Sequence, residues 1–350
     1  MDVEERMRLV ALRPTEEIVT EDELRQLLET KEHPRAYDGF EPSGYAHIGS
    51  VLQRAIKAKD FIDAGIEFVI LLADWHAYLN NKLGGDMERI REAGKYFKKV
   101  WELLGVEDIK IVWASELIER TEYWERLLKI STAVTVERIK RAGTIMGRKE
   151  AEMQKASFLI YPLMQATDIF ELDVDICQLG MDQRKVNVLA REIAEKMGWK
   201  KPVLVHHHLL LGLQAGKRMG KEASPEDLKM SKSKPMTAVF VHDSPEEIRE
   251  KLRQAYCPAK VVENNPVMDI VRNLILRGRD EEEVLVVERP LKYGGTVEYH
   301  RYEDLERDFV GGRLHPLDLK NAVAEWLIKE LEPVRRYFER HGLPEFSVTR

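Results

Sequence analysis

Two stretches of the chain carry residues that could bind and transfer phosphate, and the first is residues 37–49. It reads Tyr-Asp-Gly-Phe-Glu-Pro-Ser-Gly-Tyr-Ala-His-Ile-Gly. An apolar strand over residues 35–40, which we expect to be the first strand of the chain, leads into a turn, and a helical pattern begins near Ile48. Backbone N–H groups and the positive end of a helix dipole face such a turn and can hold phosphate. His47 lies in the turn, where its imidazole can donate to phosphate oxygens.

The second stretch lies far downstream and reads Lys229-Met230-Ser231-Lys232-Ser233. Two lysines three positions apart on a loop can close over a triphosphate. Each stretch alone is weak evidence, because a bare His-Ile-Gly is common and a run of lysine and serine is usually a solvated loop. The argument therefore depends on finding both stretches in one chain.

A third set of polar residues lies in the helical pattern over residues 158–172. Tyr161, Gln165 and Asp168 fall at positions i, i+4 and i+7, so they share one face of a helix. The residues between them are largely apolar, and a buried polar stripe is costly unless something pairs with it. Three exposed polar side chains are the simpler alternative. A strand over residues 174–177 then leads into the polar turn Gly180-Met181-Asp182-Gln183.

In this order the motifs resemble the two signatures of class I aminoacyl-tRNA synthetases. The first signature is usually His-x-Gly-His, and Ser50 replaces its second histidine here, whereas the lysine signature is complete. Tyr37, the segment 161–168 and the turn 180–183 are similar to the amino-acid site of the tyrosyl-tRNA synthetases. The spacing and the compact C-terminal part most resemble the archaeal–eukaryotic branch of that family.

The resemblance implies a reaction in two steps. The carboxylate of L-tyrosine attacks the α-phosphate of ATP, and a terminal ribose hydroxyl of tRNA(Tyr) then takes the tyrosyl group, with release of AMP and pyrophosphate. No protein nucleophile is needed, so catalysis is positioning and stabilisation of charge on phosphate. ATP is a substrate, Mg²⁺ is expected to arrive with it, and we expect no tightly bound protein metal site. The family also implies a homodimer.

The resemblance assigns roles to individual residues. Catalysis is expected from His47, Lys229 and Lys232, and tyrosine binding from Tyr37, Tyr161, Gln165, Asp168 and Gln183. Tyr37 and Asp168 would bracket the substrate hydroxyl. ATP binding is expected from Gly39, Gly44, His47, Gly49, Gly180, Asp182, Lys229, Met230, Ser231 and Lys232. Contacts with tRNA are expected from Arg138, Lys140, Arg141, Tyr293, His315 and Asp318.

The remaining pattern predicts the elements that hold these residues. Strands near 66–73 and 109–114 alternate with helices near 51–64 and 86–104, which favours an α/β fold with a doubly wound parallel sheet of Rossmann type. Thr20 with Glu23, and Ser244 with Glu247, predict two helix starts with capping boxes. We place a catalytic domain at 1–235 and a mostly helical anticodon-binding domain at 236–350. The second domain has predicted helices near 246–256 and 266–277, a strand near 284–287, and a last helical stretch at 317–341 that Pro333 could bend.

A largely helical, charged insertion at about 117–157 interrupts the alternation. It is either a solvated helical face or a surface that packs on a second subunit and touches the acceptor stem. In the C-terminal part, Asp318 could be merely a helix-start carboxylate favoured by the dipole. In the family this position reads the anticodon, and Tyr293 could stack on a base.

Composition limits the alternatives. The chain has 350 residues, two cysteines and a formal net charge of −6, which argues against general coating of nucleic acid but not against local docking. No apolar run reaches membrane-spanning length and the N-terminus has no apolar signal segment, so we expect a cytoplasmic protein with no membrane partner. The adjacent histidines 206–208 do not share one face, so they are a poor metal site.

Three other functions fit parts of the pattern. A tryptophanyl-tRNA synthetase shares the fold, signatures and chemistry, but its pocket has no phenol to bracket, so Tyr37 and Asp168 favour tyrosine. A catalytically silent RNA-binding relative would not need complete histidine and lysine motifs. An adenylyltransferase of the same superfamily would lack the anticodon domain.

Overall fold

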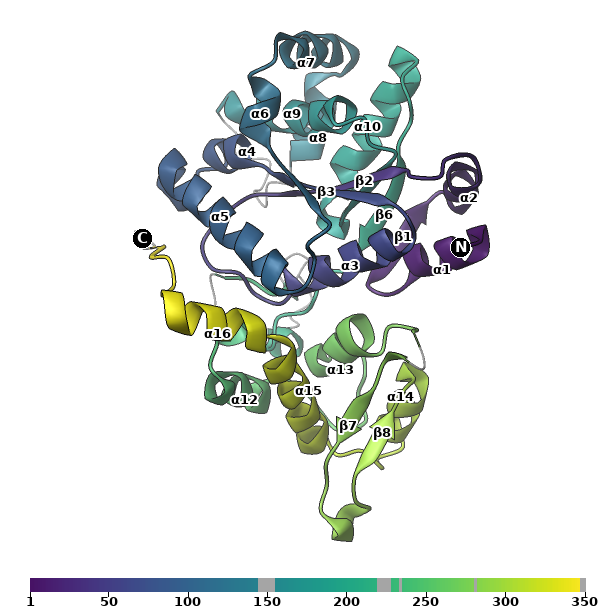
Figure 1. Cartoon of the computed structure of the whole chain (residues 1–350), viewed down its shortest axis with the longest axis vertical. Helices are drawn as coiled ribbons and strands as arrows, with labels where there is room; N and C mark the ends of the chain where they lie inside the picture. Colours follow the sequence, from purple (N-terminus) through teal and green to yellow (C-terminus); the bar gives the residue numbers. More distant parts are fainter. Residues whose placement is uncertain (144–154, 219–227, 233–234, 280–281, 347–350) are drawn as a thin grey trace.

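The computed structural model describes residues 1–143, 155–218, 228–232, 235–279 and 282–346. Within them, the larger sheet has six strands in the order β1-β6-β5-β2-β3-β4 (Figure 1). The strands are β1 (Thr15–Val19), β2 (Arg35–Phe40), β3 (Glu67–Leu72), β4 (Lys110–Trp113), β5 (Ile176–Gly180) and β6 (Val203–His207). Neighbours are parallel except β1, which pairs antiparallel with β6 at the edge. The predicted α/β fold is confirmed, with this antiparallel edge strand as an addition.

The prediction that residues 35–40 form the first strand is wrong, because helix α1 (Val3–Ala11) and strand β1 precede them. Strand β1 contains two glutamates and lies at the sheet edge, so it lacks the continuous apolar run of a buried parallel strand. Strand β5 begins and ends later than the predicted 174–177, and β6 extends through two of the adjacent histidines.

Helices cover both faces of the sheet. Strand β3 shows why: Phe68, Ile70 and Leu72 belong to the core on one face, and Val69 and Leu71 to the core on the other. The first core is covered by α1, α2 (Glu21–Thr30), α3 (Leu52–Asp63) and α5 (Met87–Leu103). The second is covered by α7 (Thr121–Ala133), α8 (Val136–Gly143), α9 (Ser157–Glu171) and α10 (Arg184–Met197). The short helices α4 (Asp74–Leu79) and α6 (Ala114–Ile118) follow β3 and β4.

The C-terminal part is helical around a small antiparallel pair, β7 (Leu285–Val287) and β8 (Val297–Tyr299). Its helices are α12 (Pro245–Gln254), α13 (Pro266–Ile270), a π-helical turn (Val271–Ile275), α14 (Tyr302–Val310), α15 (Pro316–Glu330) and α16 (Glu332–His341). Both predicted capping boxes, at Thr20 and Ser244, are confirmed. The helical stretch predicted at 317–341 is present, and the bend considered at Pro333 is a break into two helices that meet at Leu331, because proline cannot continue the helical hydrogen bonds.

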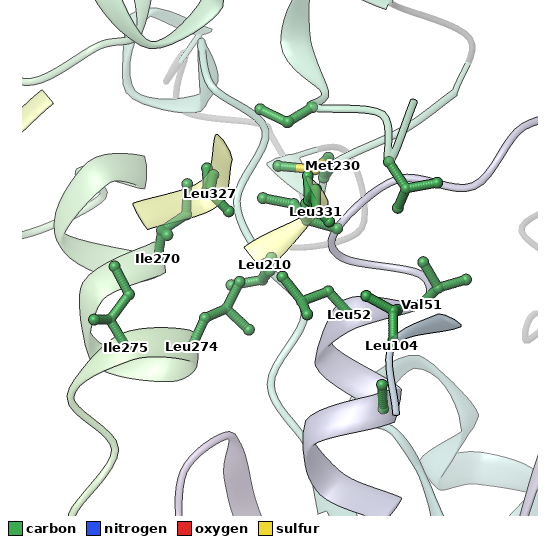
Figure 2. Close-up of a cluster of buried hydrophobic side chains, with 14 of the residues drawn as sticks. Val51, Leu52, Leu104, Leu210, Met230, Ile270, Leu274, Ile275, Leu327 and Leu331 are labelled. Carbon is green, nitrogen blue, oxygen red and sulfur yellow. The ribbon is translucent and has the colours of Figure 1, made fainter. Parts of the chain in front are cut away.

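One hydrophobic cluster joins the two parts of the molecule. Val51, Leu52 and Leu210 of the sheet-containing part lie opposite Leu274 and Leu331 of the C-terminal part (Figure 2). Helix α16 also returns to α5, and the Phe338 and Tyr96 ring centroids are 5.2 Å apart. The domain boundary at 236 remains a prediction, since the apolar core is continuous across it.

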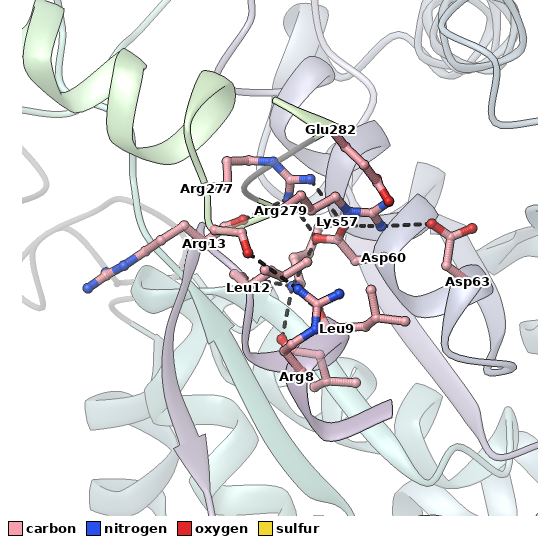
Figure 3. A network of polar contacts seen from close by, with 12 residues as sticks. Arg8, Leu9, Leu12, Arg13, Lys57, Asp60, Asp63, Arg277, Arg279 and Glu282 are labelled. Atoms are coloured by element: carbon pink, nitrogen blue, oxygen red, sulfur yellow. Dashed lines mark hydrogen bonds and ion pairs between the residues drawn. The ribbon is translucent and has the colours of Figure 1, made fainter. Parts of the chain in front are cut away.

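A buried charged network ties α3 to the segments on either side of it (Figure 3). The carboxylate of Asp60 accepts hydrogen bonds from Arg277 at 2.8 Å and from Arg279 at 3.0 Å. Lys57 is fully buried and donates to the carbonyl oxygens of Leu9 and Val10 at the end of α1 and of Leu12 just after it. Buried charges require such partners, so α3 is fixed in position relative to α1 and to the segment after the π-helical turn. In the described residues, no helix is long and apolar enough to cross a membrane.

Candidate active site

A cavity opens at the carboxyl ends of the parallel strands, where ligands of open α/β sheets bind. It gathers predicted residues from three distant stretches together with residues that the sequence did not single out. The lining includes Tyr37, Gly39, Glu41, Arg54, His76, Tyr161, Gln165, Asp168, Asp182, Gln183 and Lys232. The predicted polar stripe of α9 therefore faces a site rather than solvent, and Gln165 and Asp168 are both buried.

The inner end of the cavity is formed by Tyr37 and Asp168, whose exposed fractions are 0% and 1%. The Tyr123 hydroxyl donates to Oδ1 of Asp168 at 2.9 Å, and His76 Nε2 lies 3.1 Å from Oδ2. Within the described part of the chain, the Tyr37 hydroxyl is buried without a hydrogen-bond partner of good geometry, and Oδ2 of Asp168 has only the His76 imidazole beside it. Buried polar atoms are normally satisfied, so this end of the cavity is ready for a ligand that can both donate and accept.

His76 and Tyr123 contact Asp168 and were not among the predicted site residues. His76 lies on α4, which follows the carboxyl end of β3, where ligands of α/β sheets bind. Burial alone would lower the pKa of His76, but the adjacent Asp168 carboxylate outweighs burial and raises it. Tyr123 gave no signal, because an aromatic residue on the apolar face of α7 normally belongs to the core.

The middle of the cavity presents hydrogen-bonding groups. The Tyr161 hydroxyl donates to Oε1 of Glu41 at 2.8 Å, and Nε2 of Gln165 donates to Oε1 of Gln183 at 3.2 Å. Glu41 was not predicted; it lies in the Phe-Glu-Pro-Ser turn and also pairs with Lys82 at 3.3 Å. These groups come from α9, the turn after β5 and the turn after β2, so the first predicted stretch meets the third set of polar residues and the turn 180–183 here.

The turn after β2 has a compact structure. His47 is buried, and burial together with nearby cations lowers its pKa to about 3, so the imidazole is neutral. A Cβ at Gly49 would lie 3.3 Å from Nδ1 of His47, which explains why glycine occurs there. Ser50 Oγ accepts from the His47 amide at 3.0 Å and donates to the His47 carbonyl at 2.8 Å. The residue that replaces the second signature histidine therefore closes the turn.

Both lysines of the second signature contact residues that line the cavity. Lys229 Nζ lies 2.7 Å from Oδ2 of Asp182, and Lys232 Nζ donates to the Ser43 carbonyl and, at 3.1 Å, to its hydroxyl. Burial, with the charge of Lys82 as the next cause, lowers the pKa of Lys232 to about 7.

Other residues predicted to bind ATP surround this site without all lining it. The side chain of Met230 is buried in the hydrophobic core, which the prediction did not anticipate. Gly180 has a steric reason, because a Cβ there would lie 2.6 Å from Oδ1 of Asp182. Gly44 has a φ of 56° and lies beside Lys232, whose Cδ would be 3.8 Å from a Cβ.

The residues predicted to contact tRNA lie in two places away from the cavity. Arg138, Lys140 and Arg141 lie on α8, but the Arg138 guanidinium makes two 2.9 Å hydrogen bonds to Glu192, so it already has a structural partner. Tyr293 is 62% exposed at the end of the short helix Leu291–Tyr293.

Near Tyr293 in the sequence, the start of α15 carries the other predicted anticodon residues. Nδ1 of His315 accepts from the Leu317 amide at 3.1 Å and caps α15, and Asp318 lies in its first turn. These contacts support the helix start, and the anticodon role of both residues remains a prediction.

Among the residues described, no three His, Cys, Asp or Glu side chains gather to hold a metal ion. The adjacent histidines bind protein groups instead. His206 Nδ1 lies 2.8 Å from Glu17, His207 Nδ1 lies 2.8 Å from Gln178, and His208 Nε2 lies 2.8 Å from Asp269.

Comparison with known proteins agrees with the geometry of this site. The family model described as tRNA synthetases class I (W and Y) matches residues 29–332. The chain belongs to this family. The resemblance read from the motifs is thereby confirmed, and the signatures of this class I synthetase are the stretches that meet at the cavity.

Relatives of the synthetase include the tyrosine–tRNA ligase of Pyrococcus furiosus, which is 50% identical over 98% of this chain and 97% of the relative. The tyrosine–tRNA ligase of Aeropyrum pernix is 52% identical over 96% of this chain and 93% of the relative. Its structure resembles the tyrosyl-tRNA synthetase of Pyrococcus horikoshii complexed with L-tyrosine, with a TM-score of 0.91, 49% identity and 97% coverage of each chain. A tryptophanyl-tRNA synthetase of Plasmodium falciparum also matches, with a TM-score of 0.70 and 17% identity over 98% of this chain and 90% of that one, which shows a shared fold alone.

Proposed function

We infer that the protein is a tyrosine–tRNA ligase, which activates L-tyrosine with ATP and transfers it to the 3′-terminal ribose of tRNA(Tyr). The observation that carries this inference is the inner end of the cavity. The Tyr37 hydroxyl and the Asp168 carboxylate both line the cavity, and a phenol can accept from the first and donate to the second. An indole offers only a donor, so the same groups would leave the Tyr37 hydroxyl unpaired.

The relatives support tyrosine over tryptophan independently. Those at about 50% identity over nearly the whole chain are tyrosine–tRNA ligases. The tryptophanyl-tRNA synthetase in the comparison is 17% identical, so it shows a shared fold alone. A catalytically silent RNA-binding relative is disfavoured, because both lysines of the lysine signature contact residues that line the cavity.

The first step is supported by how the polar groups are arranged along the cavity. Tyr161, Gln165 and Gln183 would hold the substrate's ammonium group, which directs its carboxylate towards the α-phosphate of ATP. The new bond joins a carboxylate oxygen to the α-phosphorus, the bond to the bridging oxygen breaks, and pyrophosphate leaves with the electron pair. Lys232, Lys229 and the turn around His47 would stabilise the charge on the phosphates.

ATP would replace existing contacts when it binds. Asp182, beside Gly180, is our candidate for the ribose contact, and it must release Lys229, which is then free for the leaving phosphates. Gly44 and Gly49 of the turn, with Gly39 near the end of β2, would allow ATP to approach closely. Met230 and Ser231 would contribute backbone groups of the lysine loop. Mg²⁺ would be held by ATP oxygens and supplies charge neutralisation.

The partners beyond ATP and tyrosine are proposals of the same kind. Exposed Tyr293, with His315 and Asp318, would read the anticodon, and the basic residues of α8 would approach the acceptor stem. A homodimer is supported by exposed apolar side chains one turn apart on α7, where Trp124 is 44% and Leu128 62% exposed. Both cysteines are free thiols, which agrees with the cytoplasm as a reducing location.

The test is amino-acid-dependent exchange between ATP and pyrophosphate with each of the twenty amino acids. We expect exchange with tyrosine alone, followed by charging of tRNA(Tyr) with labelled tyrosine. Exchange with tryptophan instead would replace the proposed substrate, and no exchange with any amino acid would remove the proposed activity.

A further inference from the structure

Two cations from distant segments of the chain meet at one aromatic ring beside the cavity. The guanidinium carbon of Arg54 lies 5.3 Å from the Phe40 ring centroid, and Nζ of Lys232 lies 5.8 Å from it. Arg54 comes from α3 and Lys232 from the lysine loop. Lys232 belongs to the second signature, whereas Arg54 belongs to neither signature and is not explained by the function proposed so far.

Arg54 lies one helical turn after Ser50 and lines the cavity with a side chain that is 15% exposed. Its Nη1 donates to the Ser50 carbonyl at 3.0 Å, and its Nε lies 2.8 Å from Oδ2 of Asp38, which is fully buried on β2. Ser50 presents no charge to the cavity, because its hydroxyl is used inside the His47 turn. Arg54 is therefore the cation that α3 offers to a ligand.

The charge balance around Arg54 favours an anionic ligand. After burial, the charge of Arg54 is among the causes that lower the pKa values of His47 and Lys232, so Arg54 is close enough to repel a charged Lys232. The neighbouring carboxylates are already engaged, Asp38 with Arg54 and Glu41 with Lys82. A buried ion pair such as Asp38–Arg54 contributes little stability by itself. A polyanion between Arg54 and Lys232 would remove the repulsion.

We propose that Arg54 is a catalytic residue of tyrosine activation that binds the phosphates of ATP, and that Asp38 positions its guanidinium. Arg54 thereby supplies from α3 the donor group that Ser50 cannot. The planar fork of arginine matches phosphate oxygens, and its charge stabilises the negative charge that moves to pyrophosphate when the α-phosphorus bond breaks. This inference rests on the proposed function and adds a residue to it.

The first test is Arg54→Gln in tyrosine-dependent ATP–pyrophosphate exchange. We expect kcat/KM for ATP to fall by about 10²-fold, the usual loss for one donor to a developing charge, while the Kd of tyrosine measured by calorimetry stays unchanged. Arg35→Gln is the matched control, because Arg35 lies at the other end of β2 and pairs with Glu67 at 3.0 Å. It should keep the parent values for ATP.

The second test asks whether Arg54 and position 50 share a role. Adding Ser50→His to Arg54→Gln should recover about tenfold of the lost kcat/KM for ATP, which a purely structural arginine would not allow. If Arg54→Gln fails to fold, the double change Asp38→Val with Arg54→Met removes both charges together and should fold, bind tyrosine and still lose ATP turnover.

Different outcomes would overturn the role of Arg54 and the proposed function on which it rests. Parent kcat and KM for ATP in folded Arg54→Gln, or in the folded double variant, would overturn the role of Arg54. Absence of tyrosine-dependent exchange in the parent protein would instead overturn the proposed function.

Discussion

At the scale of single residues, the inner end of the cavity is organised by one carboxylate. Asp168 uses Oδ1 to accept from Tyr123 and keeps Oδ2 beside His76 and the cavity. Tyr37 faces it from the central strand β2, and burial, with Cys177 and Asp168 as further causes, raises the pKa of its hydroxyl well above the usual value. The Tyr37 hydroxyl therefore stays protonated and can donate.

Removing either group should weaken the choice of tyrosine over phenylalanine. In Asp168→Ala and Tyr37→Phe we expect the ratio of kcat/KM for the two amino acids to fall, each loss corresponding to roughly 1–3 kcal/mol, because phenylalanine no longer leaves that group unpaired. The measurement is tyrosine- and phenylalanine-dependent pyrophosphate exchange. ATP binding should survive in both variants.

Tyr123→Phe is the graded control for this prediction. It removes a hydrogen bond to Asp168 but leaves the carboxylate in the cavity, so its effect on the ratio should be smaller. Folded Asp168 and Tyr37 variants that retain the parent ratio would show that neither residue reads the hydroxyl.

How much of the site could be predicted depends on whether its residues share a local period. Gln165 and Asp168 were found because helical spacing places them on one face. Glu41, Arg54 and Tyr123 were not, because each acquires its role only when another segment packs against it. A single sequence carries no signal for such contacts between distant segments.

At the scale of elements, the lysine loop is held against the turn after β2 before ATP is considered. Lys232 contacts Ser43, and Lys229 pairs with Asp182. Burial and the nearby Lys82 lower the pKa of Lys232 to about 7, so above this pH the amine is largely neutral in the free protein. A triphosphate between the elements would favour its charged form.

ATP binding should therefore be coupled to proton uptake by Lys232. At pH 8 we expect the parent protein to take up close to one proton more per ATP bound than Lys232→Arg does. The guanidinium of that variant is charged in both states. The measurement is calorimetric titration with ATP, without tyrosine, in buffers of different ionisation enthalpy.

The comparison between the two proteins cancels the protons that belong to ATP itself. Equal uptake in the parent and in Lys232→Arg would mean that Lys232 does not change its charge when ATP binds. At pH 6, where the amine is already charged, the difference should disappear.

Elements with strong local signals were predicted well. Strand β3 has a continuous apolar run, and α2 and α12 have capping boxes, so their positions followed from the sequence. Strands β1 and β8 and helix α14 were not anticipated. Strand β8 has three residues and exists because β7 pairs with it, which is a tertiary cause.

At the scale of the whole molecule, His208 joins the sheet-containing part to the C-terminal part. Its Nδ1 lies 3.0 Å from Glu16 and its Nε2 lies 2.8 Å from Asp269 of α13. Burial opposes its charge, but the hydrogen bonds to Asp269 and Glu16 raise its pKa to about 10 from an ordinary 6.5. The folded state therefore holds a proton here that the unfolded chain releases near pH 6.5.

The stabilisation from His208 should be complete below about pH 6.5 and disappear as the pH rises towards 10. We expect the free energy of unfolding to fall by about 2–4 kcal/mol across this window because of His208, and this part of the decline to vanish in His208→Gln. Denaturant unfolding at several pH values measures it. His33→Gln is the control, since His33 is 74% exposed, and an identical decline in all three proteins would contradict the assignment.

Asp318 lies on α15 and does not line the cavity, so charging of tRNA and activation of tyrosine should be separable. Asp318→Ala should slow charging of tRNA(Tyr) by the equivalent of roughly 1–3 kcal/mol, the value of a specific base contact, and leave pyrophosphate exchange unchanged. Initial rates of both reactions measure it. Leu317→Ala, one position away on the same helix turn, controls for the helix start, and equal losses of both activities in Asp318→Ala would indicate a damaged fold.

The contact between Tyr45 and the segment after α16 sets an order of assembly during protein synthesis. Tyr45 lies in the turn that precedes His47, and its hydroxyl donates to the Pro344 carbonyl at 3.0 Å while its ring packs against Phe346. Pro344 is translated 299 residues after Tyr45, and Phe346 follows two residues later. Domains usually begin to fold from the N-terminus while the ribosome is still working. In this protein the covering of that turn must wait until residue 346 has left the ribosome, so a nascent chain contains the complete turn sequence before it has the packing that covers it.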